Sequence, residues 1–381
     1  MLALLLLLAP LQAPAERAPA PAQAPAAVLS APLDVSALLE AVRVQHDLPG
    51  MIGLTLERER VVALGATGLR KSGNDARMLA TDLVHIGSCT KAMTATLCAR
   101  LVQQGKLTWE STLAQVFAQS APKMHPTWRD VTLEQLLQHR SGAPANVKPD
   151  RKGTPRQQRV RQLASVTAEP LPAERRGKFE YSNVGYVLAG HMAEHVAGLD
   201  FEELIQRELF QPLGIASAGS GAPGTASQLS QPRGHLEMGL PIEPGPAGDN
   251  PLGMAPAGTL HMRIDDWAKF VALHLSGERD GWKSASGDEL LPAEAFVRLH
   301  TPPEGGDYAL GWATAKRAWA GGTALNHNGS NTMWYCVTWL APERGFAFLV
   351  ATNQGGKKAA EGCNAAVGEL MKTYLQEQTR R

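Results

Sequence analysis

The chain has 381 residues, of which 44% are hydrophobic and 19% are charged, a composition typical of a soluble globular protein long enough for a large core. Its formal net charge is +1, so electrostatics favours neither nucleic acid nor an anionic membrane surface as a partner. The sequence contains no nucleic-acid-binding motif and no internal repeat of fixed period.

The N-terminus predicts export. The run MLALLLLLAP is apolar but too short to span a bilayer, and Ala13-Pro14-Ala15 offers the small residues that a signal peptidase accepts. We therefore predict a signal peptide at residues 1–15 and a Pro/Ala-rich tether at 16–32. The mature protein is expected to have no membrane span and to be periplasmic or secreted.

Apolar residues at helical or alternating spacing predict the elements of the first half. Residues 33–47 are expected to form a helix, and residues 51–69 two strands joined by a charged turn. From residue 89 to about 210 the pattern is mostly helical, and Gly105 is expected to end the first helix of this block. Further helices are expected at 131–140, 183–197 and 201–214.

The second half begins with a long segment, residues 211–260, that is rich in Gly, Pro, Ser and Ala. Its length favours a substrate-facing excursion or a mobile loop over a simple connector. A helix is expected to start at Asp265 or Asp266. Alternating residues then predict strands at 308–315, 333–340 and 345–352, the last two paired as a hairpin before an amphipathic C-terminal helix.

Strands at both ends of the chain, with helices between them, predict one sheet built from both ends. We therefore expect an α+β fold in which an antiparallel β-sheet is flanked by helices and carries an inserted all-helical lobe. A single domain at 33–375 would divide into an α/β lobe at 33–87 and 260–381 and a helical lobe with the long loop at 88–259. A site would lie in the cleft between the lobes.

The four cysteines do not have the spacing of a zinc site. In an exported chain of this length they permit disulfides, and three full pairings are possible. Buried free thiols are the alternative, which we favour for Cys98. The residues concerned are Cys89, Cys98, Cys336 and Cys363.

Ser88 and Lys91, in the segment HIGSCTKAM, stand where an apolar helix begins. Serine is a favoured N-cap, so a purely structural role is one alternative. Lys91 follows at i+3 on the same helix face, and its apolar surroundings and the helix dipole are expected to lower its pKa. A neutral lysine beside a serine hydroxyl is a general base; the alternative is a surface lysine with a buried stem.

Two later segments carry further candidates. In FEYSNVGY, the Tyr181 phenol could relay a proton and Asn183 could bind Lys91 and the substrate; the alternative is that Ser182 or Asn183 caps the next helix. In NHNGSNTMWY, His327 and Gly329 are expected just before a strand, where glycine lets a ligand approach the backbone. A polar turn between strands is the alternative there.

Ser88-x-x-Lys91, Tyr181-x-Asn183 and His327-x-Gly329, in this order before a terminal hairpin, resemble the motifs of the serine β-lactamase-related superfamily. This superfamily contains class C β-lactamases, penicillin-binding DD-peptidases, and related esterases and D-amino-acid peptidases. The segments LLQHRSGAP, ELFQPLGI and AGTLHMRIDDWAKF resemble further parts of it. The resemblance covers about 35–375 and implies a β-lactamase/transpeptidase-like fold and a serine hydrolase of small-molecule or peptide substrates, with no metal and no cofactor.

The resemblance also implies roles for single residues. Ser88 would attack a carbonyl and become acylated, and water would release the acyl group. Lys91 and Tyr181 would share the proton transfers, and which of them is the base stays open. Backbone N–H groups of Ser88 and Ser330 would form the oxyanion hole. The residues expected on the substrate and oxyanion side of the site are Asn183, His327, Gly329 and Ser330.

The third motif departs from the β-lactamase pattern. His327 and Asn328 stand where β-lactamases have a lysine and a hydroxyl residue, which help to hold the substrate carboxylate. A neutral histidine supplies no permanent charge. An ester or peptide substrate is therefore favoured over a β-lactam, and a β-lactam hydrolase or DD-peptidase is the alternative.

Other interpretations remain for comparison. A catalytically silent protein that binds peptides or acyl groups would have no physical need for an intact Ser88, Lys91 and Tyr181. The helix segment 191–195 fits the H-x-x-E-H zinc-peptidase pattern, although no third ligand stands out downstream, and an amphipathic helix with outward polar residues is the alternative. Cys89 is not expected to be a nucleophile, because adjacent helix positions do not share a face.

Overall fold

The computed structural model describes residues 31–380. The predicted signal peptide at 1–15 and nearly all of the predicted tether at 16–32 therefore lie outside the described residues.

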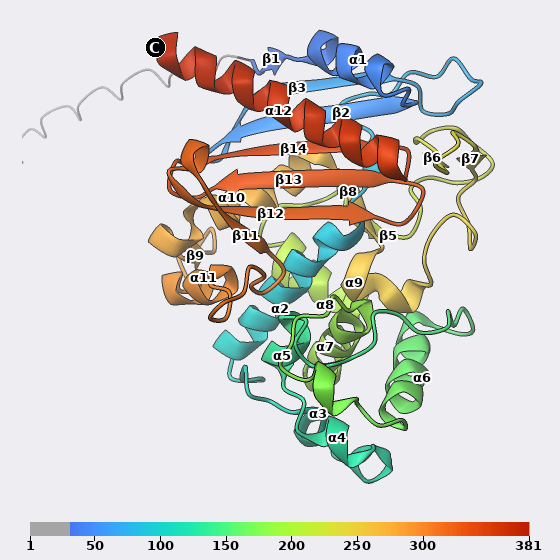
Figure 1. Ribbon diagram of the computed structural model, residues 1–381, viewed down its shortest axis with the longest axis vertical. Coiled ribbons are helices and arrows are strands. Elements are labelled where there is room, and N and C mark those ends of the chain that lie inside the picture. The colour runs from blue at the N-terminus through green and yellow to red at the C-terminus, as the bar shows by residue number, and fades with distance from the viewer. Residues whose placement is uncertain (1–30, 381) are drawn as a thin grey trace, which may run out of the picture. The chain divides into compact units, whose positions relative to one another are not determined.

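A seven-stranded sheet is assembled from both ends of the chain (Figure 1). Its order is β1-β3-β2-β14-β13-β12-β11, so that β2 from the first hairpin lies beside β14 from the last. Every neighbouring pair is antiparallel except β1 with β3, which confirms the predicted fold class apart from this short edge strand. The strands are β1 (Leu33–Asp34), β2 (Gly50–Glu57), β3 (Arg60–Gly68), β11 (Ala313–Arg317), β12 (Gly322–Ser330), β13 (Tyr335–Ala341) and β14 (Phe346–Thr352).

Both faces of the sheet are covered. On β14, Phe348 and Val350 pack with the cluster under α1 (Ser36–Gln45) and α12 (Lys357–Arg380), which cross the face seen in Figure 1. The residue between them, Leu349, faces the opposite cluster, which includes α10 (Ile264–Asp280). This alternation along one strand is the period of two that β-structure requires, and each fully buried side chain of this kind contributes roughly 1.5–3 kcal/mol.

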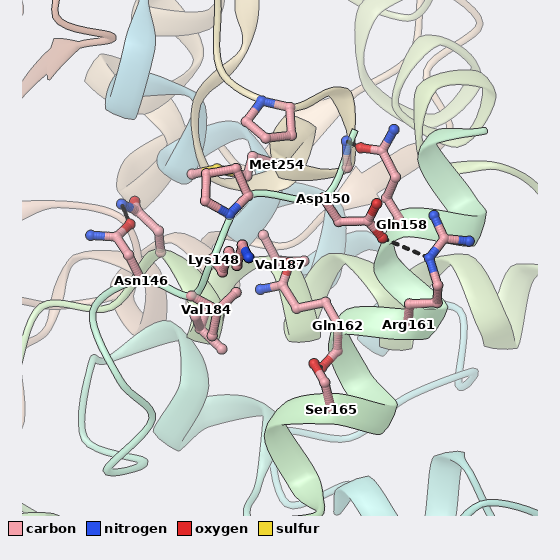
Figure 2. Close-up of a pocket in the computed structure, with 15 residues that line it drawn as sticks. Asn146, Lys148, Asp150, Gln158, Arg161, Gln162, Ser165, Val184, Val187 and Met254 are labelled. Atoms are coloured by element: carbon pink, nitrogen blue, oxygen red, sulfur yellow. Dashed lines mark hydrogen bonds and ion pairs between the residues drawn. The ribbon is translucent and has the colours of Figure 1, made fainter. Parts of the chain in front are cut away.

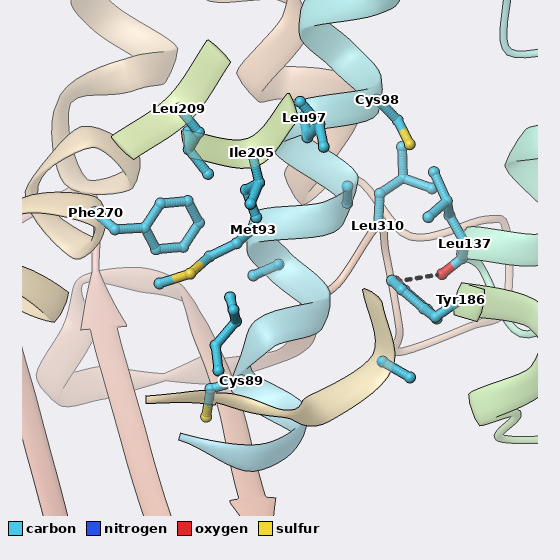
Figure 3. Close-up of a cluster of buried hydrophobic side chains, with 14 of the residues drawn as sticks. Cys89, Met93, Leu97, Cys98, Leu137, Tyr186, Ile205, Leu209, Phe270 and Leu310 are labelled. Atoms are coloured by element: carbon cyan, nitrogen blue, oxygen red, sulfur yellow. Dashed lines mark hydrogen bonds between the residues drawn. The ribbon is translucent and has the colours of Figure 1, made fainter. Parts of the chain in front are cut away.

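Helix α2 (Thr90–Gln103) connects the sheet to the helical part of the chain. Met93 and Leu97 point toward Phe270 of α10 and toward the helix that follows residue 200, whereas Cys98 lies on the side of Leu137 (Figure 3). The helix is therefore buried nearly all round, as its apolar sequence predicts. The other helices of this part are α3 (Leu113–Val116), α4 (Pro126–Arg129), α5 (Leu133–Leu137), α6 (Pro155–Thr167), α7 (Asn183–Ala197), α8 (Phe201–Ile205) and α9 (Ala255–Gly258).

Several predicted boundaries are wrong. The strand expected at 308–315 is mostly a loop, and Gly311 (φ +83°) lets that loop approach the backbone of Ala92 in α2. The strand β12 was not predicted, and the His327 motif lies inside its end rather than before a strand. The helix expected at 131–140 ends at Leu137, and the one expected at 201–214 continues beyond α8 as a π-helical turn at Gln206–Phe210.

The segment 211–260 contains short elements of its own. Strands β5 (Gly219–Ser220), β6 (Gly234–His235) and β7 (Pro241–Ile242) precede α9, and β5 pairs with β8 (Leu260–Arg263), which also pairs with β4 (Leu83–His85). This small sheet connects the segment to the strand that leads into Ser88. The remaining strands are β9 (Trp282–Lys283) and β10 (Glu289–Leu291), and the remaining α-helix is α11 (Ala293–His300).

Across residues 31–380, no helix has both the length and the apolar character needed to cross a membrane.

Candidate active site

Ser88 lies in a 3-10 turn, Gly87–Cys89, between β4 and α2. Helix α2 begins at Thr90 with Cys89 in the N-cap position, and neither the turn nor the helix has a side-chain cap. The alternative that Ser88 is a helix cap is therefore wrong. The side chain is partly exposed, and it contacts Lys91 instead of the backbone of its own helix.

Lys91 is completely buried, so it is not the surface lysine of the alternative interpretation. Its Nζ lies 3.1 Å from Ser88 Oγ and donates to Asn183 Oδ1 at 2.7 Å and to the main-chain oxygen of Ala257 at 2.7 Å. Burial lowers the pKa of Lys91 from its ordinary value of 10.5 to about 7.

The three contacts of Lys91 fit a neutral amine. An uncharged –NH₂ group has two N–H bonds and one lone pair, and the two carbonyl acceptors, from Asn183 and Ala257, take the two N–H bonds. The lone pair then points at Ser88 Oγ, which is the direction needed to accept the serine proton. An ammonium group would instead donate to all three oxygens.

Tyr181 and Asn183 reach the site from the start of α7. Ser182 is the N-cap of this helix, because its Oγ accepts the N–H of Gly185 at 2.9 Å, so Asn183 is free to contact Lys91. The Asn183 amide also donates to Asn146 Oδ1 at 2.8 Å. The alternative that this triplet is a cap is thus correct for Ser182 and does not apply to the side chain of Asn183.

The Tyr181 phenol lies beside Ser88 and packs on the buried ring of His139, with 4.3 Å between ring centroids. Burial raises the pKa of Tyr181, and the neighbouring Ser88 hydroxyl offsets part of that rise. His139 Nδ1 accepts the N–H of Ser182 at 3.0 Å, and burial lowers the pKa of His139 to about 2, so the ring under Tyr181 is neutral.

The end of β12 packs directly against the Ser88 turn. A Cβ atom on Gly329 would collide with the Ile86 carbonyl oxygen and lie 2.9 Å from the Ser88 nitrogen. A Cβ on Gly87, whose φ is +47°, would collide with the Ser330 nitrogen. The two glycines therefore allow the main-chain nitrogens of Ser88 and Ser330 to lie on adjoining backbone segments.

His327 does not present a free ring to solvent. It is 4% exposed; its Nδ1 lies 2.7 Å from the Asn328 main-chain oxygen and its Nε2 lies 3.1 Å from the Tyr308 hydroxyl. Because Nδ1 must donate to the carbonyl, Nε2 accepts from Tyr308. Burial, followed by the nearby Lys91, lowers the pKa of His327 to about 3, so the imidazole carries no charge at neutral pH.

A pocket of about 260 Å³ adjoins this cluster (Figure 2). Asn183 forms part of its wall, and the side chain of Asn183 contacts Lys91, so the pocket lies next to the Ser88–Lys91 pair. Apolar side chains from α7 and the segment before α9 line one part, and polar side chains of α6 line another. These residues include Val184, Val187 and Met254 on the apolar side and Gln158, Gln162 and Ser165 on the polar side.

The structure thus brings Ser88, Lys91, Tyr181 and Asn183 into direct contact and places the end of β12 beside them. Sequence reasoning missed the Ala257 carbonyl, which holds Lys91, and two side chains, His139 and Tyr308. His139 and Tyr308 were visible only as parts of a helix end and a strand, although LLQHRSGAP was already noted as a family-like segment. No side-chain signal identifies a backbone acceptor such as Ala257.

The H-x-x-E-H segment has a structural role. Glu194 is fully buried and binds Arg159 at 2.7 Å and His191 Nδ1 at 2.7 Å, while Arg159 also binds Glu202. The interpretation of this helix as having all its polar residues outward is wrong, because only His195 is exposed. Within residues 31–380, no group of three His, Cys, Asp or Glu side chains is arranged to hold a metal ion.

All four cysteines are buried free thiols. Cys89 Sγ lies 3.6 Å from the His327 main-chain oxygen and 3.6 Å from Cys336 Sγ. Burial and the neighbouring Cys336 raise the pKa of the Cys89 thiol, so it stays protonated. The residue after Ser88 is therefore part of the hydrophobic core.

Comparison with known proteins gives the same assignment as the motifs. The chain is similar to penicillin-binding protein 4 of Amycolatopsis lactamdurans, with 25% identity over 83% of this chain and 84% of that protein. It is also 27% identical to an unguisins hydrolase of Aspergillus campestris, over 71% of this chain and 52% of that protein.

Solved structures show the same fold. An octameric penicillin-binding protein homologue from Pyrococcus abyssi superposes with a TM-score of 0.71 at 22% identity, covering 88% of this chain and 76% of that one. A class C β-lactamase from Rhodobacter sphaeroides superposes with a TM-score of 0.69 at 18% identity, covering 89% and 98%. The β-lactamase family profile matches residues 35–372, and the chain therefore belongs to the β-lactamase family of serine hydrolases.

Proposed function

We propose that this member of the β-lactamase family is an exported serine hydrolase that acts through an acyl-enzyme on an ester, amide or lactam carbonyl. The observation that carries the proposal is the environment of Lys91. A buried amine with a pKa of about 7 has its two N–H bonds taken by carbonyl oxygens and lies 3.1 Å from a serine hydroxyl. This is the arrangement expected of a serine nucleophile with its base.

In the proposed first step, Ser88 Oγ forms a bond to the substrate carbonyl carbon and gives its proton to Lys91 Nζ. The carbonyl electron pair moves onto oxygen, where the main-chain N–H groups of Ser88 and Ser330 would stabilise the charge. We assign the base role to Lys91 rather than to Tyr181, because burial raises the pKa of the phenol and lowers that of the amine. A protonated phenol is suited to donate.

Collapse of the tetrahedral intermediate breaks the bond to the leaving group. Tyr181, whose hydroxyl lies beside Ser88, would pass a proton to that group, and the proton held by Lys91 would replace it. A water molecule then attacks the acyl carbon with its proton going to Lys91, and the acid leaves as Ser88 recovers its hydrogen. Asn183 keeps Lys91 in place throughout.

The substrate preference follows from His327. Both ring nitrogens are occupied within the protein and the ring is neutral, so the third motif offers no cation for a substrate carboxylate. This supports esterase or peptidase activity ahead of β-lactam hydrolysis. The pocket beside Asn183, whose wall has apolar, polar and charged side chains, would take an acyl or side-chain group of the substrate.

The experiment that tests this function is intact-mass analysis during turnover of a p-nitrophenyl ester. Wild type is expected to gain the mass of one acyl group in rapidly quenched samples, and Ser88→Ala is expected to gain none and to release no p-nitrophenol. Turnover by Ser88→Ala at the wild-type rate would refute the proposal. Export is tested separately, by N-terminal mass after expression, which should show cleavage after Ala15.

A further inference from the structure

Asp249 is a buried carboxylate in the segment 211–260, at 5% exposure, and the reaction proposed above gives it no role. Three N–H groups converge on it. Its Oδ2 lies 2.9 Å from His85 Nε2, and its Oδ1 accepts from the Asn331 amide at 2.8 Å and from the Asn250 main chain at 2.7 Å. His85 and Asn331 are themselves buried, at 0% and 3% exposure.

The two side-chain partners of Asp249 belong to the two segments that carry the proposed oxyanion donors. His85 ends β4, three residues before Ser88. Asn331 follows directly after Ser330 at the end of β12. One carboxylate therefore links the backbone before Ser88 to the backbone after Ser330.

The contact on the Ser88 side continues through the imidazole. His85 Nδ1 accepts the main-chain N–H of Gly87 at 3.1 Å, so Nδ1 carries a lone pair and Nε2 carries the hydrogen that is donated to Asp249. Gly87 has a left-handed backbone, and a Cβ at this position would collide with the Ser330 nitrogen. The carboxylate thus fixes the ring that holds the Ile86–Gly87 peptide, which is next to the peptide that carries the Ser88 N–H.

On the other side, Asn331 uses both ends of its amide. Its Nδ2 donates to Asp249 and its Oδ1 accepts the N–H of Met333 at 3.2 Å, which turns the chain after Ser330. Thr332, in the middle of this turn, has a φ of +75°. A turn that holds a residue in this unfavourable region depends on such side-chain contacts.

We propose that Asp249 is a positioning residue that sets the separation of the Ser88 and Ser330 N–H groups, by binding His85 and Asn331 at the same time. The inference rests on the proposed function, because it concerns the oxyanion hole of that reaction. Displacing an oxyanion donor slightly should weaken binding of the tetrahedral state more than binding of the planar substrate.

The test compares Asp249→Asn with Asp266→Asn. Asp266 is a matched control, since it is also a buried aspartate at 5% exposure and accepts main-chain N–H groups, those of Ala216 and Ser217, which have no part in the proposed reaction. An asparagine at 249 keeps the size but removes the charge and one acceptor. Each variant is assayed for kcat and KM on a p-nitrophenyl ester, for inhibition by phenylboronic acid, which forms a tetrahedral adduct with serine, and for Tm.

We expect Asp249→Asn to lower kcat by roughly 10- to 100-fold and to weaken inhibition by phenylboronic acid by a similar factor. KM should change by less than about threefold. Asp266→Asn should lower Tm and leave kcat and boronate inhibition near wild type. If Asp249→Asn does not fold, Asn331→Ala removes one arm of the link and should give the same pattern with a smaller loss.

Two outcomes overturn the inference. The inference fails if Asp249→Asn has a lower Tm but wild-type kcat and boronate affinity, because Asp249 is then only structural. The same result for Asn331→Ala, where it is used in place of Asp249→Asn, has the same meaning. If kcat falls while boronate affinity does not, the oxyanion site is not what Asp249 controls. Absence of ester turnover and of boronate binding by wild type would instead refute the proposed function, and the inference with it.

Discussion

The acidity of Lys91 makes a quantitative prediction for the pH dependence of turnover. Because burial lowers the pKa of Lys91 to about 7, kcat/KM for a p-nitrophenyl ester should rise with pH along a single limb centred near pH 7. Below that point the rate should fall about tenfold per pH unit, since only the neutral amine accepts the Ser88 proton. At pH 5 about 1% of the plateau should remain.

The size of the effect follows from the shift itself. An amine with the ordinary pKa of 10.5 would be neutral in about one molecule in 3,000 at pH 7, whereas a pKa of about 7 makes it neutral in about half of them. His139 and His327, with pKa values of about 2 and about 3, are too acidic to produce the same limb.

The assay is a set of initial rates between pH 5 and pH 9 for wild type, Lys91→Arg and Lys106→Arg. Lys106 is an exposed lysine just beyond α2 and serves as the matched control, so its variant should keep the wild-type profile. Lys91→Arg should be inactive at every pH, because arginine stays protonated. A wild-type limb centred above pH 9, or a rate independent of pH, would refute the assignment of Lys91 as the base.

The same pKa shift also has a consequence for stability. The pKa of Lys91 is lower in the folded state than in the unfolded state, so folding releases a proton where the amine is charged in the unfolded chain. This difference lowers the free energy of unfolding. The loss is absent above pH 10.5, grows as the pH falls, and is constant below pH 7. Below pH 7, a pKa shift of this size lowers the free energy of unfolding by about 4–5 kcal/mol. Lys91→Met leaves two acceptors without this donor, the Ala257 carbonyl and Asn183 Oδ1, at a cost of about 1 kcal/mol each. The variant should therefore be more stable than wild type at pH 7 by about 2 kcal/mol, and the gain should shrink toward pH 10.

Three further predictions concern the surroundings of the site. Gly329→Ala should lower the unfolding free energy by about 1–3 kcal/mol and reduce activity, because the new methyl collides with the Ile86 carbonyl; urea unfolding with unchanged Cm would contradict this. Glu194→Ala should lower the unfolding free energy by about 3 kcal/mol, because it removes a partner of the buried Arg159. EDTA should leave wild-type activity unchanged, and inactivation by EDTA would restore the zinc interpretation. Gln162→Trp should narrow the pocket and raise KM for long-chain p-nitrophenyl esters but not for the acetate, and an equal rise for both would contradict the pocket's role.

Much of this arrangement is predictable from the sequence because it depends on local spacing. Ser88 and Lys91 are one helical turn apart, and burial of Lys91 follows from the apolar residues on every side of α2. The first and last hairpins follow from alternating residues and short turns. That one sheet is built from both ends also follows, because the strands of the seven-stranded sheet all lie near the two ends of the chain.

The parts that could not be predicted depend on contacts between distant segments. Strand β12 was missed because its inward positions include His327 and Gly329, which do not look like core residues, although Leu325, His327 and Gly329 do alternate with more exposed positions. Similarly, Arg159 and Glu194 are 35 residues apart, and nothing in either segment shows that they form a buried ion pair.

The measurement that tests the central claim most directly is a pair of initial rates, with a chromogenic cephalosporin and with a short-chain p-nitrophenyl ester, for wild type, Ser88→Ala and Ser276→Ala. Ser276 lies in α10, where its Oγ donates to the main-chain carbonyl of Ala272 in the same helix, so its variant should behave as wild type. We predict turnover by wild type, faster on the ester than on the cephalosporin, and none by Ser88→Ala. Equal turnover by wild type and Ser88→Ala would contradict the claim that Ser88 is the nucleophile.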